Sequence, residues 1–251
     1  MVESGLDPIP RERFDAVLFD MDGVLTDTAG VHASAWKRMF DDYLRARAAR
    51  TGERFIPFDI ASDYTHHVDG KPRGDGVRDF LTARGIALPE GSPEDPPSAE
   101  TVHGLGHRKD LRVNEVIDAE GVRLFPGTVP LLERLRAAGI KTAVVTSSQN
   151  RARVLEAAGL AALFDAAVDG HTIAASGLAG KPAPDMFLEA ARRLGVPPAR
   201  AVVVEDAISG IEAGVRGGFG LVVGVARRGN AAALESHGAQ RVVVELSELL
   251  S

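Results

Sequence analysis

The sequence predicts an α/β protein with a doubly wound, Rossmann-like parallel sheet and a helical cap domain inserted after the first strand. Three observations support this fold class. Short Val-rich runs alternate with amphipathic stretches, as in proteins whose parallel strands are joined by crossover helices. The interval that follows the first run lacks such strands and has helical patterns instead. Finally, polar side chains come directly after several of the runs, where open sheets of this type bind ligands.

Length and composition limit the class of protein. The chain has 251 residues, of which 45% are apolar and 25% charged, so it can bury a sizeable core and is not mostly disordered. It has no cysteine, which excludes disulfides, thiolate metal sites and a cysteine nucleophile. The net charge of −6 argues against nucleic-acid binding. No apolar run reaches the roughly 20 residues of a membrane span, and no secretory signal is found. We therefore expect a cytoplasmic protein without nucleic-acid or membrane partners. A monomer is also expected, although none of these observations determines the oligomeric state.

Five runs predict the strands of the sheet. Each is short and rich in Val or other apolar residues, as expected of strands that are buried on both faces. In chain order the runs are Ala16–Phe19, Thr142–Val145, Ala201–Val204, Leu221–Val225 and Val242–Val244.

Amphipathic stretches predict the helices. In the second half of the chain a glycine follows each stretch, and glycine in that position is a helix stop signal. These helices are Val129–Ala138, Arg151–Ala158 and Asp185–Leu194. In the interval after the first strand, the predicted helices are Val31–Arg50, Gly76–Arg84 and Val102–Ile117.

The order of these elements predicts two domains. We expect an α/β core of residues 1–28 and 121–251, and a helical cap of residues 29–120. An inserted cap is favoured over a linker between independent domains, because the single short strand before the insert must join the later sheet. Within the cap, the Pro-rich segment Pro89–Ser98 is expected to be an exposed loop.

Two pairs of acidic residues follow predicted strands. Asp20 and Asp22 end the first strand, and crowded carboxylates there favour a proton or a hard cation between them. Glu205 and Asp206 close the run Ala201–Val204, where two acids are costly to bury unless they hold a cation. The alternatives are a solvated acidic turn for the first pair and acids that complement a helix N-terminus for the second.

Hydroxyl groups and a lysine follow in the same way. Thr146, Ser147 and Ser148 come after the second strand, where hydroxyls beside exposed backbone N–H groups can hold phosphate oxygens. Simple capping of the helix near Asn150 is the alternative. Lys181 lies between a glycine and a proline, in a chain with only five lysines. An ammonium can pair with a carboxylate and a transferring phosphoryl group, whereas the alternative is a surface lysine on a turn.

Taken in order, these four signals resemble the motifs of the haloacid dehalogenase superfamily of phosphoryl-transfer enzymes. The matching segments are DMDGVLTD, VVTSS, GKPAPDMF and VVVEDAISGIEAG, and they extend over the whole predicted core. The resemblance implies a Rossmann-like core, a mobile cap, bound Mg²⁺ and a phospho-aspartyl intermediate.

The resemblance also implies a role for each motif residue. Asp20 would be the nucleophile and a magnesium ligand, and Asp22 the general acid and base that also gives its backbone carbonyl to the metal. Asp206 would complete the magnesium site with Glu205, which acts directly or through water. Three residues would hold the transferred phosphate: Thr146, Ser147 and Lys181. These roles fit phosphoryl transfer, which depends on positioning and on neutralisation of charge.

Within the superfamily, the cap is similar to that of the β-phosphoglucomutase-like subgroup. The matching segments are Asp27–His32 with Trp36-Lys37, Gly70–Arg73 and His107–Asp110. The implied substrate is a small phosphorylated sugar, and the implied reaction converts β-glucose 1-phosphate into glucose 6-phosphate through glucose 1,6-bisphosphate. The residues implied in binding this substrate are Asp27, His32, Trp36, Arg73, Lys109, Ser148 and Asn150. Among them, Arg73 and Lys109 would bind the phosphate distant from the reaction, and His32 would reach the active site on closure.

The main alternative is a phosphatase for sugar phosphates or other small phosphate esters, which needs only one phosphate site. In that case Arg73 and Lys109 are solvated surface charges and His32 is an ordinary helix histidine. Two features depart from the subgroup, namely the longer loop Pro89–His103 and Gln149, which stands where a basic residue is expected. A signalling receiver module is disfavoured, because such a module is about half as long as this chain and has no helical insert after its first strand. A dinucleotide-binding protein is disfavoured because Gly214–Gly220 follows a predicted helix.

Overall fold

The structure is a computed structural model that describes residues 7–250. The chain divides into two compact units. The core unit contains the described residues up to Asp27 and those from Val122 onward, and the helical unit is Thr28–Gly121. That the helical unit acts as a cap stays a prediction.

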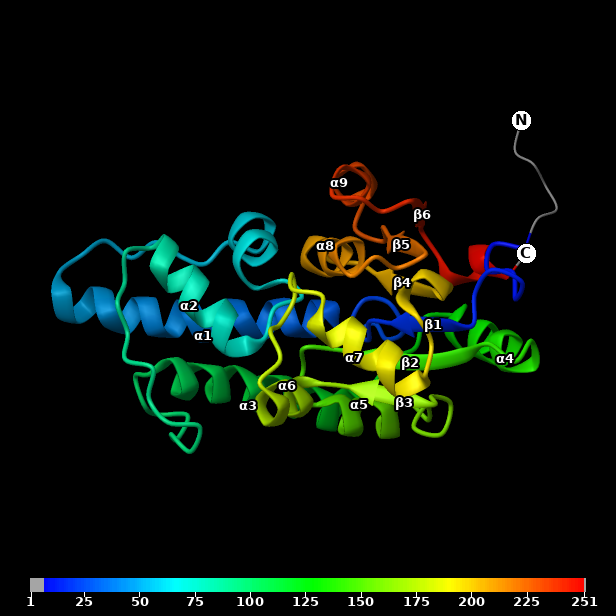
Figure 1. Cartoon of the computed structure of the whole chain (residues 1–251). Helices are drawn as coiled ribbons and strands as arrows, with labels where there is room; N and C mark the ends of the chain where they lie inside the picture. The colour runs from blue at the N-terminus through cyan, green and yellow to red at the C-terminus, as the bar shows by residue number, and fades with distance from the viewer. Residues whose placement is uncertain (1–6, 251) are drawn as a thin grey trace. The chain divides into compact units, whose positions relative to one another are not determined.

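Among the described residues, the core unit contains a six-stranded parallel sheet in the order β3-β2-β1-β4-β5-β6 (Figure 1). The first strand lies in the centre, between β2 and β4, and Ala16 is in register with both Lys141 and Ala201. The strands are β1 (Ala16–Phe19), β2 (Lys141–Val145), β3 (Ala166–Val168), β4 (Ala201–Glu205), β5 (Leu221–Val225) and β6 (Arg241–Val243). The doubly wound parallel sheet is therefore confirmed.

The predicted strands agree closely with the observed ones. Two bounds differ by one residue, and β6 lies one residue earlier than predicted. Placing Val244 in the strand was wrong, because its N–H donates to Glu248 Oε1 (2.8 Å) and its side chain is exposed. The prediction also missed β3, a three-residue edge strand whose first two residues are only half-buried.

The helices of the core unit cover both faces of the sheet. They are α4 (Thr128–Ala137), α5 (Arg151–Ala157), α6 (Gly170–Ser176), α7 (Asp185–Leu194), α8 (Ile208–Arg216) and α9 (Ala231–Ser236), with 3₁₀ turns η2 (Pro198–Arg200) and η3 (Leu246–Leu249). Met186, Phe187 and Ile211 from α7 and α8 share one buried cluster with Leu18 of β1. All four residues of β1 are buried, as expected for a central strand that is covered on both faces.

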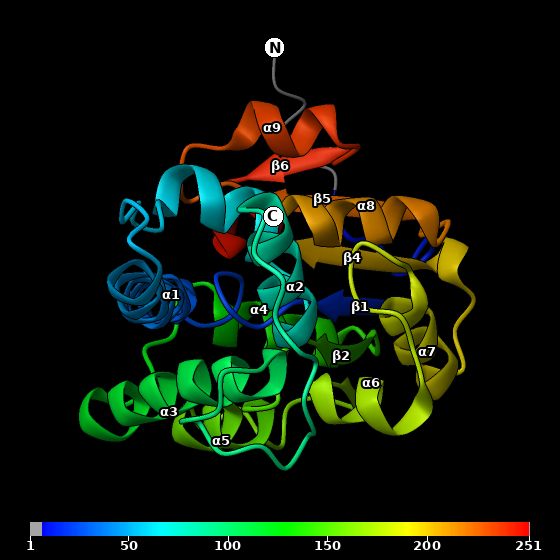
Figure 2. The same cartoon turned by 90° about the vertical axis from the view of Figure 1, so that its left-hand side faces the viewer.

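The helical unit has a hydrophobic core of its own. Its elements are α1 (Ala29–Thr51), the π-helix η1 (Ile60–Val68), α2 (Arg73–Ala83) and α3 (Val102–Glu120), and α1 and α3 lie side by side (Figure 1, Figure 2). Phe40 is at the centre of its core, with ring centroids 5.3 Å from Trp36, 5.1 Å from Phe58 and 4.2 Å from Phe80. Residues 28–121, all of them described, contain no strand, as predicted. The π-helix was missed.

The two chain connections that lead to the helical unit are tied together inside the core unit. The N–H of Asp27 donates to the carbonyl of Arg123 (2.9 Å), and the N–H of Phe125 donates to that of Leu25 (3.3 Å). The segment that leaves β1 and the segment that returns to the sheet are thus hydrogen-bonded neighbours. The described residues include no helix of the length and apolarity needed to span a membrane.

Candidate active site

The candidate site lies at the carboxyl edge of the sheet, where three adjacent strands end. Because β1, β2 and β4 are parallel and in register, the residues that follow them reach the same edge. Asp20 follows β1, Thr146 follows β2, and Asp206 follows β4, whose last residue is Glu205. The N–H of Asp20 still donates to Val204 of β4 (2.9 Å), so the nucleophile candidate is held by the sheet itself.

A tight turn after β1 brings Asp22 back to the site. Its glycine, Gly23, has φ +93°, a backbone conformation that other residues rarely adopt. A Cβ atom at Gly23 would also clash with Asp206 Oδ2, so the turn approaches that carboxylate closely. As a result, Asp22 Oδ2 lies 3.4 Å from Thr146 Oγ1 on the neighbouring strand.

Lys181 is buried at the centre of this cluster, so it is not a surface lysine. Its Nζ donates to Asp20 Oδ1 (2.6 Å) and to Glu205 Oε1 (2.5 Å). The ammonium also lies 5.1 Å from the centroid of Phe187, which fixes the side chain from another direction. This geometry places one cation between the carboxylates of two different strands.

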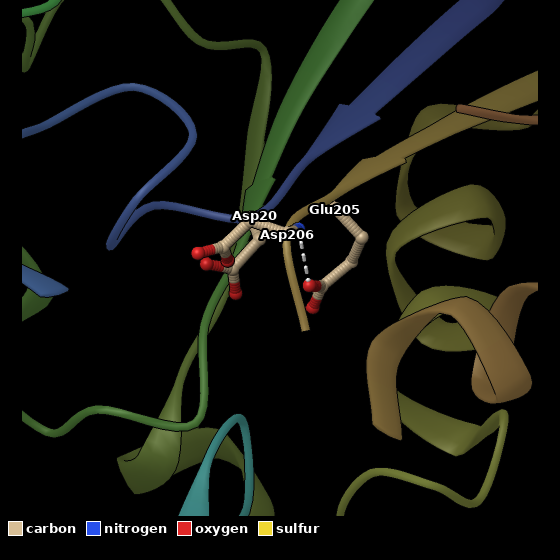
Figure 3. Close-up of side chains that lie close together, drawn as sticks. All are labelled: Asp20, Glu205 and Asp206. Atoms are coloured by element: carbon tan, nitrogen blue, oxygen red, sulfur yellow. Dashed lines mark hydrogen bonds between the residues drawn. The ribbon is translucent and has the colours of Figure 1, made fainter. Parts of the chain in front are cut away.

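The carboxylate of Glu205 accepts three hydrogen bonds. Its Oε2 accepts the backbone N–H groups of Asp206 and Ala207, both at 2.8 Å, and its Oε1 accepts from Lys181. A Cβ at Gly210 would overlap Oε1, so the glycine provides the space for this side chain. In Figure 3 the carboxylates of Asp20 and Asp206 turn to the same side, whereas that of Glu205 turns away from them.

Three carboxylates of the cluster fit a hard divalent cation. Asp20, Glu205 and Asp206 are buried, and each offers one oxygen such that all three atoms lie within 4.8 Å of one another (Figure 3). Carboxylate oxygens in a small buried group are the donors that Mg²⁺ prefers. The residues present therefore fit the metal that the motifs imply.

The electrostatics of the site also favour a cation. Burial raises the pKa of the Asp20 carboxyl well above its usual value; the ammonium of Lys181 opposes this shift, and the surrounding carboxylates add to it. For Lys181, burial acts to lower the pKa, but Asp20 and Glu205 outweigh it and hold the pKa above its usual value. A divalent cation beside Asp20 would stabilise its anionic, nucleophilic form.

The hydroxyl motif forms a hydrogen-bonded turn. Thr146 Oγ1 accepts the N–H of Ser148 (3.1 Å), and Ser148 Oγ accepts the N–H of Asn150 (3.1 Å). Ser147 Oγ lies 3.8 Å from the sulfur of Met186. The side chain of Asn150 makes no capping bond to α5, and its buried Nδ2 has no hydrogen-bond partner among the described residues. The hydroxyls of the motif thus organise the turn before α5, and their role in holding a phosphate stays a prediction.

Two arginines of the site were missed by the sequence analysis. Arg227 and Arg228 follow β5 and reach the same edge of the sheet. Arg227 Nη1 donates to the carbonyl of Gly23 (2.5 Å), and Arg228 Nη2 lies 2.5 Å from Asp206 Oδ2. The signal was available, since basic residues directly after a Val-rich strand occupy the same position as the four motifs.

In the helical unit, three predicted residues come together. Lys109 Nζ on α3 lies 2.8 Å from His32 Nδ1 on α1, and its ammonium lies 5.5 Å from the Trp36 ring centroid. Lys109 and His32 are both buried, so Lys109 is not a solvated surface charge. Arg73 at the start of α2 forms an ion pair with Asp110, and burial lowers the pKa of Arg73.

Asp27 belongs to the core unit and is exposed. Its carboxylate lies 3.4 Å from Arg123 Nη2, beside the paired chain connections. Within the core unit, the described contacts do not bring it to Asp20 or Lys181. Its assignment to the substrate stays a prediction.

Comparisons with known proteins agree with the motif pattern. The family model of haloacid dehalogenase-like hydrolases matches residues 14–218. The chain is 53% identical over 242 residues to "Beta-phosphoglucomutase" of Mycobacterium bovis, covering 95% of this chain and 92% of the relative. Among solved structures, a hydrolase from Pseudomonas syringae aligns with TM-score 0.75 and 26% identity over 94% of this chain and 96% of that one. The β-phosphoglucomutase of Clostridium difficile aligns with TM-score 0.72 and 26% identity, covering 94% and 93%.

Proposed function

This chain belongs to the haloacid dehalogenase-like hydrolase family, and from that premise we propose that it is a magnesium-dependent β-phosphoglucomutase. The proposed reaction converts β-glucose 1-phosphate into glucose 6-phosphate through glucose 1,6-bisphosphate. The observation that carries the chemistry is the buried group of Asp20, Lys181 and Asp206 at one sheet edge. The choice of sugar rests on the mycobacterial relative. Activity in the cytoplasm, as a monomer, is part of the proposal.

In the first half-reaction, the carboxylate of Asp20 attacks phosphorus and the bond from phosphorus to the ester oxygen of the donor breaks. Lys181 lies beside Asp20 and offsets the charge that gathers on the reacting oxygens. Asp20, Asp206 and the backbone carbonyl of Asp22 would hold Mg²⁺. Glu205, whose oxygens are already engaged, would act through water. When bound, Mg²⁺ reduces the repulsion between the anionic nucleophile and the anionic phosphate.

Asp22 would move the proton. Asp22 follows β1 in the chain, and the Gly23 turn places its carboxylate close to the hydroxyl of Thr146, which follows β2. We expect its carboxyl to protonate the leaving oxygen and then, in the second half-reaction, to take the proton from the sugar hydroxyl that attacks phospho-Asp20. The hydroxyls of Thr146 and Ser147 and the N–H of Ser147 would orient the phosphate, whereas the N–H of Thr146 donates to the carbonyl of Val168 in the sheet (3.0 Å).

A mutase needs a second phosphate site, because its bisphosphate intermediate carries two phosphates. Arg73 and Lys109 of the helical unit supply cations of the required type, and both are held by neighbouring side chains. The second candidate function is a phosphatase for small phosphate esters. The similarity to a hydrolase of Pseudomonas syringae supports that alternative.

One experiment separates the two functions. We expect the protein, incubated with Mg²⁺ and β-glucose 1-phosphate, to release glucose 6-phosphate, and to do so faster when a trace of glucose 1,6-bisphosphate primes Asp20. Coupled assays for glucose 6-phosphate and for inorganic phosphate measure both outcomes in one sample. Stoichiometric release of inorganic phosphate without glucose 6-phosphate would replace the mutase with the phosphatase.

Replacement of Arg73 by alanine tests the role of the helical unit. We expect transfer between the sugar positions to lose about 2–4 kcal/mol of transition-state binding, because a charge-assisted contact to the distal phosphate is removed. Hydrolysis of acetyl phosphate should hardly change, since that substrate has no distal group.

The matched control is Arg78→Ala on the same helix, which removes an exposed arginine that pairs with Asp75 and Glu90. It should leave both reactions unchanged. An equal fall of both reactions in the Arg73 variant would indicate a folding role for its pair with Asp110. No fall in either would favour the phosphatase.

A further inference from the structure

The carboxylates of the site are neutralised by two cations that are held very differently. Lys181 is completely buried and pairs with Asp20 and Glu205. Arg228 pairs with Asp206, and its side chain remains 41% exposed while that of Asp206 is 7% exposed. One counter-ion is therefore fixed in the interior, and the other reaches the acidic group from solvent.

Hydrogen bonds on both sides of Arg228 hold the backbone of this turn in place. The turn therefore directs the Arg228 guanidinium toward Asp206. On one side, Arg227 donates to the carbonyls of Gly23 (2.5 Å) and Val24 (3.3 Å), and its guanidinium lies 3.5 Å from the centroid of Phe125. On the other side, Asn230 Nδ2 donates to the backbone carbonyl of Asp206 (3.3 Å). These contacts fix the turn, and the side chain of Arg228 that extends from it is partly exposed to solvent.

Arg228 binds the same carboxylate that would serve as a metal ligand. Asp206 Oδ2 accepts from Arg228 at 2.5 Å, and the backbone of Gly23 also approaches that oxygen closely. A carboxylate oxygen bound to a guanidinium is a poorer ligand, because its lone pairs are engaged and a positive charge lies close to the cation.

We propose that Arg228 is a counter-ion that holds Asp206 while no metal is bound and gives up that carboxylate to Mg²⁺, so that it lowers the affinity of the site for the metal. This inference rests on the proposed function in one respect, namely that Mg²⁺ binds at Asp206. Beyond the proposed function, the inference assigns a role to Arg228. This residue competes with Mg²⁺ for the Asp206 carboxylate and thereby sets the Mg²⁺ concentration at which the site fills.

The test measures binding of Mg²⁺ alone to chelator-treated protein, by calorimetry and without substrate. We expect Arg228→Ala to bind Mg²⁺ about 1.5-fold to fivefold more tightly than the wild type, the range for one partly exposed ion pair. Arg228→Gln serves as a second variant with a similar side-chain size. The matched control is Arg192→Ala, which removes an exposed arginine of the core unit that pairs with Glu189. Its affinity should equal that of the wild type.

Thermal unfolding gives an independent measurement. Without metal, Arg228→Ala should unfold at a lower Tm than the wild type. At saturating Mg²⁺ the Tm values of the two proteins should agree. The rise in Tm on adding Mg²⁺ should therefore be larger in the variant. In an Asp206→Ala background, the loss that Arg228→Ala causes without metal should be smaller than in the wild type, because the pair with Asp206 is already gone.

The outcomes distinguish this inference from the proposed function. A wild-type protein that binds Mg²⁺, with unchanged or weaker binding in both Arg228 variants, would overturn the inference and leave the proposed function standing. A wild-type protein that binds no Mg²⁺ would overturn both.

Discussion

Asp20→Asn is expected to reduce turnover by at least roughly a thousandfold, because the amide cannot attack phosphorus and the covalent route is lost. The variant should also fail to form a phosphoenzyme. Incubation with radiolabelled glucose 1,6-bisphosphate followed by acid quenching would show labelled protein for the wild type only. Activity above about a tenth of the wild-type value would exclude Asp20 as the nucleophile.

The stability of this variant provides the control. Burial raises the pKa of Asp20, so at neutral pH the ionised carboxyl is less favourable in the folded protein than in the unfolded chain. A neutral amide removes that cost, and Lys181 keeps Glu205 as a partner. We therefore expect the metal-free variant to have a Tm at least as high as the wild type at neutral pH. A large fall in Tm would mean that lost activity reflects unfolding.

Lys181→Met is expected to damage both stability and catalysis. It leaves the carboxylates of Asp20 and Glu205 buried without their cation, and breaking a buried ion pair costs about 3–5 kcal/mol of unfolding free energy. The transferred phosphate also loses a charged contact, which should lower kcat by roughly a hundredfold to a thousandfold. Urea unfolding and steady-state kinetics measure the two losses.

The stability loss should depend on pH in a defined direction. Lys181 acts to lower the pKa of Asp20, so its removal raises that already elevated pKa further. A group whose pKa is higher in the folded state stabilises the fold once it is protonated, so the deficit should shrink as the pH falls through the raised pKa. Lys141→Met is the matched control, since Lys141 Nζ contacts only the carbonyl of Leu194 in the described hydrogen bonds. A deficit that is the same at pH 5 and pH 7.5 would contradict this explanation.

Much of the site could be predicted because it is built on the strand ends. The Val-rich runs determine β1, β2 and β4, and a parallel sheet brings the residues after these runs to one edge. Position along the chain was thus enough to group Asp20, Thr146 and Asp206 before any side-chain contact was known. The short edge strand β3 was missed because three residues carry too little periodicity.

Contacts between distant helices could not be predicted from pattern alone. Lys109 and His32 are 77 residues apart, and their pairing depends on how α1 packs on α3. Only the family resemblance placed both in one group. Arg228 was missed for another reason: the arginines after β5 were not grouped with the motif residues, although their place after a strand end could have indicated them.

The pairing of the two chain connections at Asp27 and Arg123 has an evolutionary consequence. The insert begins and ends at hydrogen-bonded neighbours, so to the core unit it is equivalent to a long loop whose two ends are already held together. Lengthening such a loop costs little extra chain entropy. Mutations, insertions or even whole replacement of residues 28–121 can therefore be explored while β1 remains paired with β2 and β4. Under the function proposed above, selection can modify the helical unit, which would recognise substrates, separately from the core unit, which would perform the chemistry. Proteins with this chain arrangement can thus evolve toward new substrates while the residues at the sheet edge stay unchanged.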